Sequence, residues 1–123
     1  MSEPILSIRF FRTEAGNEPV RDFLHELPSK DRKVIGTDIK EVQFGWPLGM
    51  PLVRKIERDL WEIRSHVDGR IVRILFTVLE GEMVLLHAFI KKSQKTPRSD
   101  LDAARARKSL LSGGTNEKQT YRQ

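Results

Sequence analysis

The sequence predicts an α/β domain of the α+β type, in which a twisted, mainly antiparallel sheet packs against two N-terminal helices and a short C-terminal helix. Two observations carry this prediction. Three consecutive stretches between residues 59 and 92 have the composition of β-strands, and two turn sequences separate them. Between residues 17 and 45, apolar residues instead recur at the three- and four-residue spacing of amphipathic helices.

The three central strands are expected at residues 59–64, 70–77 and 83–92. Asp68 and Gly69 join the first two strands, and Asp-Gly between apolar runs favours a two-residue hairpin turn with positive φ. Glu80 and Gly81 join the second and third strands. This second signal is weaker, because glutamate is not favoured at positive φ.

A two-residue turn fixes which side chains lie opposite one another. With Val67 opposite Arg70, the pairs predicted across the first hairpin are Trp61 with Phe76, Ile63 with Ile74, and Arg64 with Arg73. The apolar pairs then share the core face of the sheet, and the arginine pair shares the other face. Two opposed arginines destabilise a sheet by about 0.2–1 kcal/mol, so this pair indicates an anionic partner.

The second hairpin is expected to close with Leu79 opposite Glu82. That register places Ala88 beside Arg73, with Ile90 and Lys92 further along the same side. It places His87 and Phe89 on the core face, as packing residues.

The remaining elements are expected at residues 4–11 (strand), 17–28 and 29–45 (helices), 52–56 (strand) and 98–110 (helix). Asn17 and Ser29 are expected to cap the two N-terminal helices, and Thr96 to cap the last one with Pro97 at its first position. Gly45 is expected just beyond the end of the second helix.

Length and composition predict one domain at residues 1–111, followed by a Gly-rich, polar tail at residues 112–123 that we expect to be disordered. The net charge of +5 and the pI of about 9.8 favour an anionic partner. The chain has no cysteine, which excludes disulfides and thiolate zinc sites. No apolar run reaches membrane-spanning length and no signal peptide is evident, so we expect a cytoplasmic protein without a membrane partner.

Three stretches resemble a known family. They are Leu-Trp-Glu-Ile-Arg at 60–64, Arg-Ile-Leu-Phe at 73–76, and Leu-Leu-His-Ala-Phe-Ile-Lys-Lys-Ser-Gln-Lys-Thr-Pro at 85–97. Over roughly residues 5–110 the chain resembles the RelE/HigB-like type II toxin superfamily, and its phage-derived HigB-like branch in particular. The resemblance implies a compact RelE-like fold and an endoribonuclease that cleaves messenger RNA, usually on the ribosome. It also implies a HigA-like, helix-turn-helix antitoxin as partner.

The residues fit such chemistry without a metal or cofactor. Cleavage of RNA by its own 2′-hydroxyl needs stabilisation of charge on the phosphate, together with a base and an acid. We expect Arg64 and Arg73 to clamp the phosphate, because arginine binds phosphate through two hydrogen bonds and stays charged. Lys92 is the preferred base by register, and Lys91 is the alternative, because neighbouring cations favour a neutral lysine. The candidate RNA- or phosphate-binding residues are Lys95, Arg70 and Arg98.

Two other interpretations stand beside this one. A lysine run after a strand is often a solvated edge that prevents aggregation. The same basic edge also fits a non-catalytic nucleic-acid-binding or phage accessory module. Glu62 shares the arginine face and is expected to pair with Arg64 or Arg73 in the free protein. An antitoxin is expected to dock near residues 17–45, because interface cores disfavour the lysines of the catalytic edge.

Overall fold

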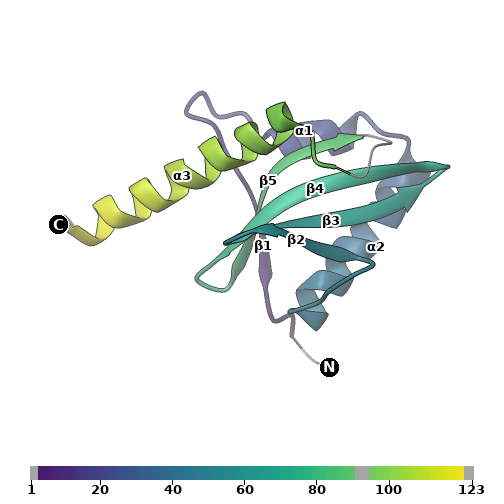
Figure 1. Ribbon diagram of the computed structural model, residues 1–123, viewed down its shortest axis with the longest axis horizontal. Coiled ribbons are helices and arrows are strands. Elements are labelled where there is room, and N and C mark those ends of the chain that lie inside the picture. Colours follow the sequence, from purple (N-terminus) through teal and green to yellow (C-terminus); the bar gives the residue numbers. More distant parts are fainter. Residues whose placement is uncertain (1–2, 91–94, 121–123) are drawn as a thin grey trace.

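The computed structural model describes residues 3–90 and 95–120, with side chains through residue 111 (Figure 1). The elements in chain order are β1 (Ser7–Phe10), α1 (Pro19–His25), α2 (Ser29–Gly45), β2 (Val53–Glu57), β3 (Leu60–Val67), β4 (Arg70–Leu79), β5 (Glu82–Ile90) and α3 (Arg98–Thr120). The strands form one sheet in the order β1-β5-β4-β3-β2. Only β1 pairs in parallel among these strands, so the predicted α+β class with a mainly antiparallel sheet is confirmed.

Helices cover both faces of the sheet, with α1 and α2 on one side and α3 on the other (Figure 1). The larger core lies under α1 and α2, where Ile35, Ile39 and Val42 of α2 meet inward-facing residues such as Ile63 and Ile74. A smaller core lies under α3 and is formed by Phe11, Leu60, Leu75, Val84, Leu86, Phe89 and Ala104. We call these the α2 face and the α3 face.

The first hairpin has the predicted register. Asp68 and Gly69 both have positive φ, at 49° and 76°, as the two-residue turn requires. Trp61 lies opposite Phe76, and Arg64 lies opposite Arg73. Glu80 also adopts positive φ, at 50°, so the weaker turn signal forms the same kind of turn.

The predicted register of the second hairpin is wrong beyond its first few pairs. Leu79 does lie opposite Glu82, but a bulge between Leu75 and Phe76 inserts one extra residue on β5. Arg73 therefore faces Phe89, and Ala88 faces Ile74. Phe89 lies on the α3 face rather than the core face predicted for it, with the Arg73 guanidinium 6.0 Å from its ring centroid.

The helices form where expected, and their ends differ from the prediction. Helix α1 begins after Glu18 rather than Asn17. Asn17 instead closes a turn with Thr13, because its backbone oxygen accepts from the Thr13 N–H and its own N–H donates to the Thr13 hydroxyl. Ser29 is the first residue of α2 and not its cap, and Gly45 is its last residue.

Helix α3 continues to Thr120, where the sequence predicts an end near Leu110. The division into a domain of residues 1–111 and a tail of residues 112–123 stays a prediction. Within the part of the chain that the structure describes, no helix has the length and apolar character needed to cross a membrane.

Trp61 provides a test of the α2-face packing. Its ring lies 5.0 Å from Trp46 and 5.9 Å from Phe76 between centroids, although part of the side chain is exposed. Trp61→Ala is expected to lower the free energy of unfolding by about 3 kcal/mol, because it removes this aromatic cluster. Denaturant unfolding measures the change, with the exposed Met50→Ala as control. An unchanged midpoint for Trp61→Ala would contradict the packing.

Candidate active site

The arginine pair lies on the α3 face of the sheet and is largely buried. Arg64 of β3 and Arg73 of β4 are directly opposite. Arg73 is fully buried, and the side chain of Arg64 is 11% exposed. The Nη1 atom of Arg73 lies 3.5 Å from the backbone oxygen of Lys95, a long hydrogen bond that joins the sheet to the segment before α3. The positive charges of Arg64 and Arg73 are thus held close together with little access to solvent.

A buried carboxylate lies beside this pair. Glu62 of β3 is fully buried and lies opposite Arg54 of β2. Its Oε2 atom accepts a hydrogen bond of 3.2 Å from the hydroxyl of Thr96, and its Oε1 atom lies 3.9 Å from Nε of Arg64. The Oε1 atom and that Nε atom have no hydrogen-bond partner among the described residues. Glu62 therefore offsets the repulsion between the arginines that the sequence implies.

The pKa values of two of these groups are shifted. Burial raises the pKa of Glu62, and the nearby Arg73, Thr96, Arg54 and Arg64 oppose that effect only in part. Burial also lowers the pKa of Arg73, against the attraction of Glu62. Both shifts have the same origin, since each charge has left water for a site that compensates it incompletely.

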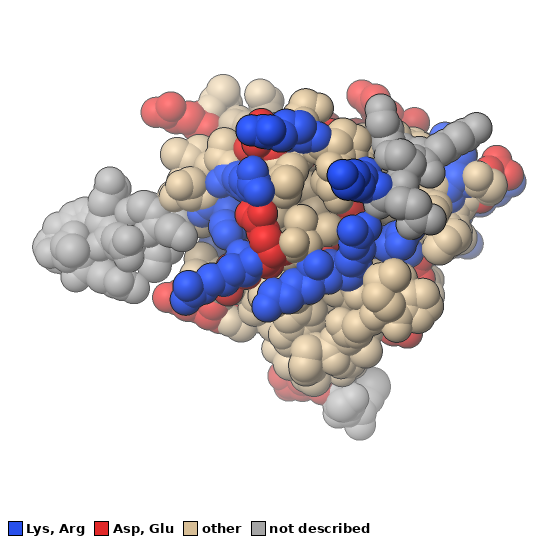
Figure 2. Space-filling view, in the orientation of Figure 1, with Lys and Arg blue, Asp and Glu red and all other residues tan. Residues whose placement is uncertain are grey.

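A groove of about 590 Å³ opens next to this cluster, between β2 and the start of α3. Its cationic lining residues are Arg54, Lys95 and Arg98, and its apolar wall is formed by Ile56, Pro97 and Leu101. Figure 2 shows Lys and Arg side chains gathered on the face of the molecule that carries α3, with acidic side chains between them. The groove can therefore hold an anion beside an apolar group, as in a nucleotide.

The structure brings together most, but not all, of the predicted site residues. Arg64, Arg73 and Lys95 lie close together, and Arg98 lines the adjoining groove. Arg70 is not in this group, because its guanidinium lies 3.2 Å from the buried Asp31 of α2, on the α2 face.

Lys91 and Lys92 lie outside the described residues. The preference for Lys92 as base depended on the register that the β5 bulge changes, so that preference has lost its support.

His87 is on the α3 face rather than the core face predicted for it. Its Nε2 atom lies 2.7 Å from Oδ1 of Asp100, and Nη1 of Arg107 lies 3.3 Å from its Nδ1 atom. Because arginine can only donate, Nδ1 is the acceptor in the contact with Arg107, and Nε2 is the nitrogen that faces Asp100. Arg107 also donates to the backbone oxygen of Leu86. His87 thus fastens α3 to β5.

Sequence reasoning missed Arg54 and gave Thr96 a different role. Arg54 meets Glu62 through the register of β2 with β3, and their Arg58-Asp59 turn contains no glycine to reveal it. Thr96 was expected to cap α3, but its hydroxyl donates to Glu62. Over the described ranges 3–90 and 95–120, no group of three or more His, Asp or Glu side chains is placed to hold a metal ion.

Comparison with known proteins gives a consistent family. The model of the family described as "Phage derived protein Gp49-like" matches residues 22–109, well over half of the chain. The chain belongs to this Gp49-like family. The match includes β3, β4 and β5, which carry Glu62 and both arginines. This places the chain in the RelE/HigB-like branch that its motifs resemble.

Two curated relatives of this Gp49-like chain are named "Probable endoribonuclease HigB1" and come from Mycobacterium tuberculosis, strains CDC 1551 / Oshkosh and ATCC 25618 / H37Rv. Each is 28% identical over 103 residues, which cover 83% of this chain and 82% of the relative. The chain is thus a distant homologue of a protein named as an endoribonuclease.

The raised pKa of Glu62 gives a pH-dependent stability that can be measured. A buried acid with a raised pKa binds its proton more tightly in the folded state than in the unfolded state. The contribution of Glu62 to stability is therefore most favourable below its ordinary pKa of 4.5, and it falls as the pH rises through the raised value. Glu62→Gln has no such titration. Unfolding of both proteins between pH 4 and 8 should show the wild type losing stability relative to Glu62→Gln as the pH rises. A constant difference would contradict the shift.

Proposed function

We propose that this protein is the toxin of a type II toxin–antitoxin system, a metal-independent endoribonuclease that cleaves messenger RNA on the ribosome in the cytoplasm. The observation that carries the proposal is the pair Arg64 and Arg73, held side by side with a buried carboxylate whose partner Thr96 lines a cationic groove. The family membership and the name of the HigB1 relatives support the same reaction class.

In this proposal the arginines supply charge stabilisation. As the 2′-hydroxyl attacks, negative charge builds on the phosphate oxygens, and guanidinium groups positioned in advance stabilise it without reorganisation. Arg64 is the better candidate for direct contact, because part of its side chain is exposed, whereas Arg73 is fully buried. Lys91 or Lys92 remains the candidate base. The groove lined by Arg54, Lys95 and Arg98 would hold the neighbouring nucleotide.

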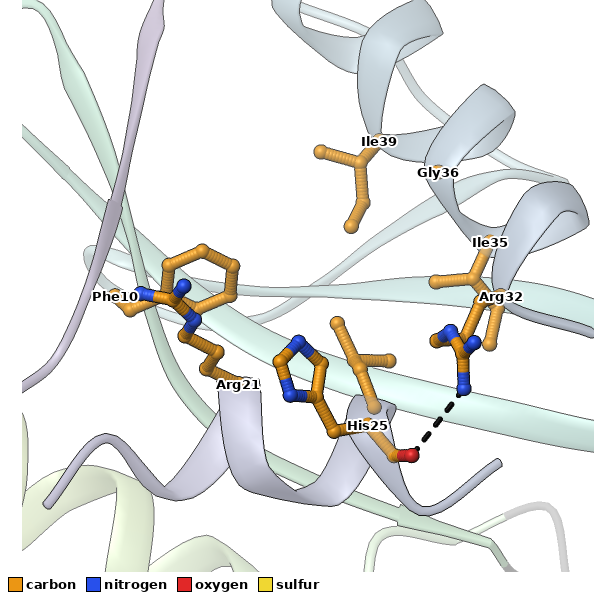
Figure 3. A pocket seen from close by; sticks show the side chains of 8 residues that line it. Phe10, Arg21, His25, Arg32, Ile35, Gly36 and Ile39 are labelled. Carbon is orange, nitrogen blue, oxygen red and sulfur yellow. Dashed lines mark hydrogen bonds between the residues drawn. The ribbon is translucent and has the colours of Figure 1, made fainter. Parts of the chain in front are cut away.

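We propose that the partner is a HigA-like, helix-turn-helix antitoxin that docks on the α1–α2 side. A groove of about 470 Å³ lies there, and its lining includes the apolar Phe10 and Ile39 and the cationic Arg21 and Arg32 (Figure 3). Gly36 lines the groove, and a Cβ atom at this position would meet nothing within 4 Å. Because glycine inside a helix costs about 1 kcal/mol relative to alanine, and packing within this chain does not require it, its place suits close approach by another molecule.

Substitution of Arg64 tests the enzymatic proposal. Arg64→Ala is expected to lower the cleavage rate of a reporter messenger RNA in a translating extract by about 10²–10³-fold, the usual effect of losing one group that stabilises the transition state. The measurement is cleavage at equal protein level, with folding confirmed by thermal unfolding. Arg9→Ala is a matched control, since Arg9 is a partly exposed arginine on β1, at the opposite edge of the sheet from β2.

A wild-type cleavage rate for Arg64→Ala would show that the arginine pair does not stabilise the transition state. Wild-type protein that binds RNA with strong salt dependence but never cuts it would instead support the rival, a non-catalytic nucleic-acid-binding module. Arg73→Ala is a poorer test, because removing one partner of a buried charge cluster costs about 3–5 kcal/mol of stability.

Docking on the α1–α2 side makes a prediction about inhibition. The antitoxin would then leave the α3 face accessible and block access to the ribosome by its bulk. The purified toxin–antitoxin complex is expected to bind a short RNA oligonucleotide at low salt about as tightly as the free toxin does. Fluorescence anisotropy with a labelled oligonucleotide measures both affinities, and the antitoxin alone is the control. Complete loss of binding in the complex would indicate that the antitoxin covers the arginine face.

A further inference from the structure

The segment that enters α3 is attached to the sheet at two neighbouring points. Thr96 donates its hydroxyl to Oε2 of Glu62, at 3.2 Å, and the backbone oxygen of Lys95 accepts a long hydrogen bond from Arg73. These residues directly follow the lysine-rich stretch at 91–94 in the sequence. Glu62 and Arg73 therefore set the position of Lys95 and Thr96, the residues that lead into α3.

Glu62 is a fully buried carboxylate whose hydrogen bonding is incomplete. Its Oε2 atom accepts a hydrogen bond from a hydroxyl, and its Oε1 atom has no hydrogen-bond partner among the residues described. Leu60 and Leu75 occupy two of the neighbouring positions on the α3 face, and Arg54 and Arg64 occupy the other two. Replacing Glu62 together with its arginine neighbours by apolar residues would remove the desolvation of their charges, so stability alone does not account for this charged cluster.

The geometry points to Glu62 as a positioning residue for the RNA-cleaving site: through Thr96 its carboxylate fixes the start of α3, and with it Lys95 and Arg98 of the cationic groove, beside Arg64 and Arg73. This inference rests on the proposed function and goes beyond it by assigning a residue that does not touch the substrate. Glu62 is fully buried beneath Thr96, so it acts through this hydrogen bond and not on the phosphate. A small misplacement of reacting groups is enough to lower a rate strongly, because catalysis depends on a precise near-attack geometry.

A double-mutant cycle across the Glu62–Thr96 hydrogen bond tests the assignment. Purified variants are assayed on ribosomes programmed with a reporter messenger RNA, and kcat and KM are determined separately. Thr96→Val removes the hydroxyl and keeps the shape of the side chain. It is expected to lower kcat at least tenfold with KM within twofold of the wild type, since the cations that bind RNA remain. Glu62→Met should have a similar effect, and the double variant should be no slower than the slower single variant, because both act through one contact.

Two further variants separate positioning from general damage. Thr96→Ser keeps a hydroxyl and should recover most of the kcat that Thr96→Val loses. Thr77→Val is the matched control, because Thr77 is a buried threonine of β4 whose hydroxyl donates to the backbone oxygen of Asp59 at 2.7 Å, away from the arginine pair. Its kcat should stay at the wild-type level. Thermal unfolding confirms that each variant assayed is folded.

Each result has a definite reading. An active wild type with a fully active Thr96→Val overturns this inference and leaves the proposed function standing. A loss in Thr77→Val equal to that in Thr96→Val also overturns it, since any missing hydrogen bond on this face would then have the same effect. A rise in KM at constant kcat for Thr96→Val overturns it in favour of a direct RNA contact. An inactive wild type overturns the proposed function and this inference with it.

Discussion

The turn at Asp68 and Gly69 fixes the register of β3 against β4, and that register decides which side chains share each face of the sheet. A slip of one residue would turn Arg64 toward the α2 core and bring Ile63 to the α3 face. Because Ile63 and Ile74 are fully buried on the α2 face, such a slip would lose much of the apolar core. Core packing on one face thus holds the arginine pair in place on the other.

The opposite charges of Glu62 and the arginines on the α3 face compensate the loss of solvation only in part. Glu62 lies near Arg54, Arg64 and Arg73, yet burial still raises its pKa, so the attraction of three cations does not repay the lost solvation. Replacing a buried ion cluster with apolar residues is often neutral or stabilising. Leu60, Leu75 and Val84 on the same face show that apolar side chains pack there. The presence of a charged cluster at this position is better explained by a functional role than by a contribution to stability.

Sequence reasoning succeeded where local rules dominate. The two positive-φ turns and the pairing of Arg64 with Arg73 follow from local turn chemistry and strand alternation. The β5 bulge was not predictable in this way, because it turns two consecutive residues toward α3: Leu86 packs in the core under that helix, and His87 contacts Asp100 and Arg107. Strict alternation cannot place two consecutive residues on one face, so the predicted positions of Ala88 and Phe89 failed together.

The long-range parts of the site were beyond sequence reasoning for the same reason. Thr96 and Glu62 are 34 positions apart in the sequence, and no local sequence pattern indicates that their side chains meet. It forms because α3 is fastened elsewhere: Arg105 donates to Glu57 of β2 at 2.7 Å and 3.0 Å, and Asp100 holds His87 of β5.

Helix α3 is attached to strands on both sides of β3 and β4. This attachment brings Lys95 and Thr96, just before the helix, into contact with Arg73 and Glu62. The site is therefore completed by the docking of α3 rather than by the sheet alone. Any change that loosens α3 would leave Arg64 and Arg73 opposite one another but would release Lys95 and Thr96 from Arg73 and Glu62.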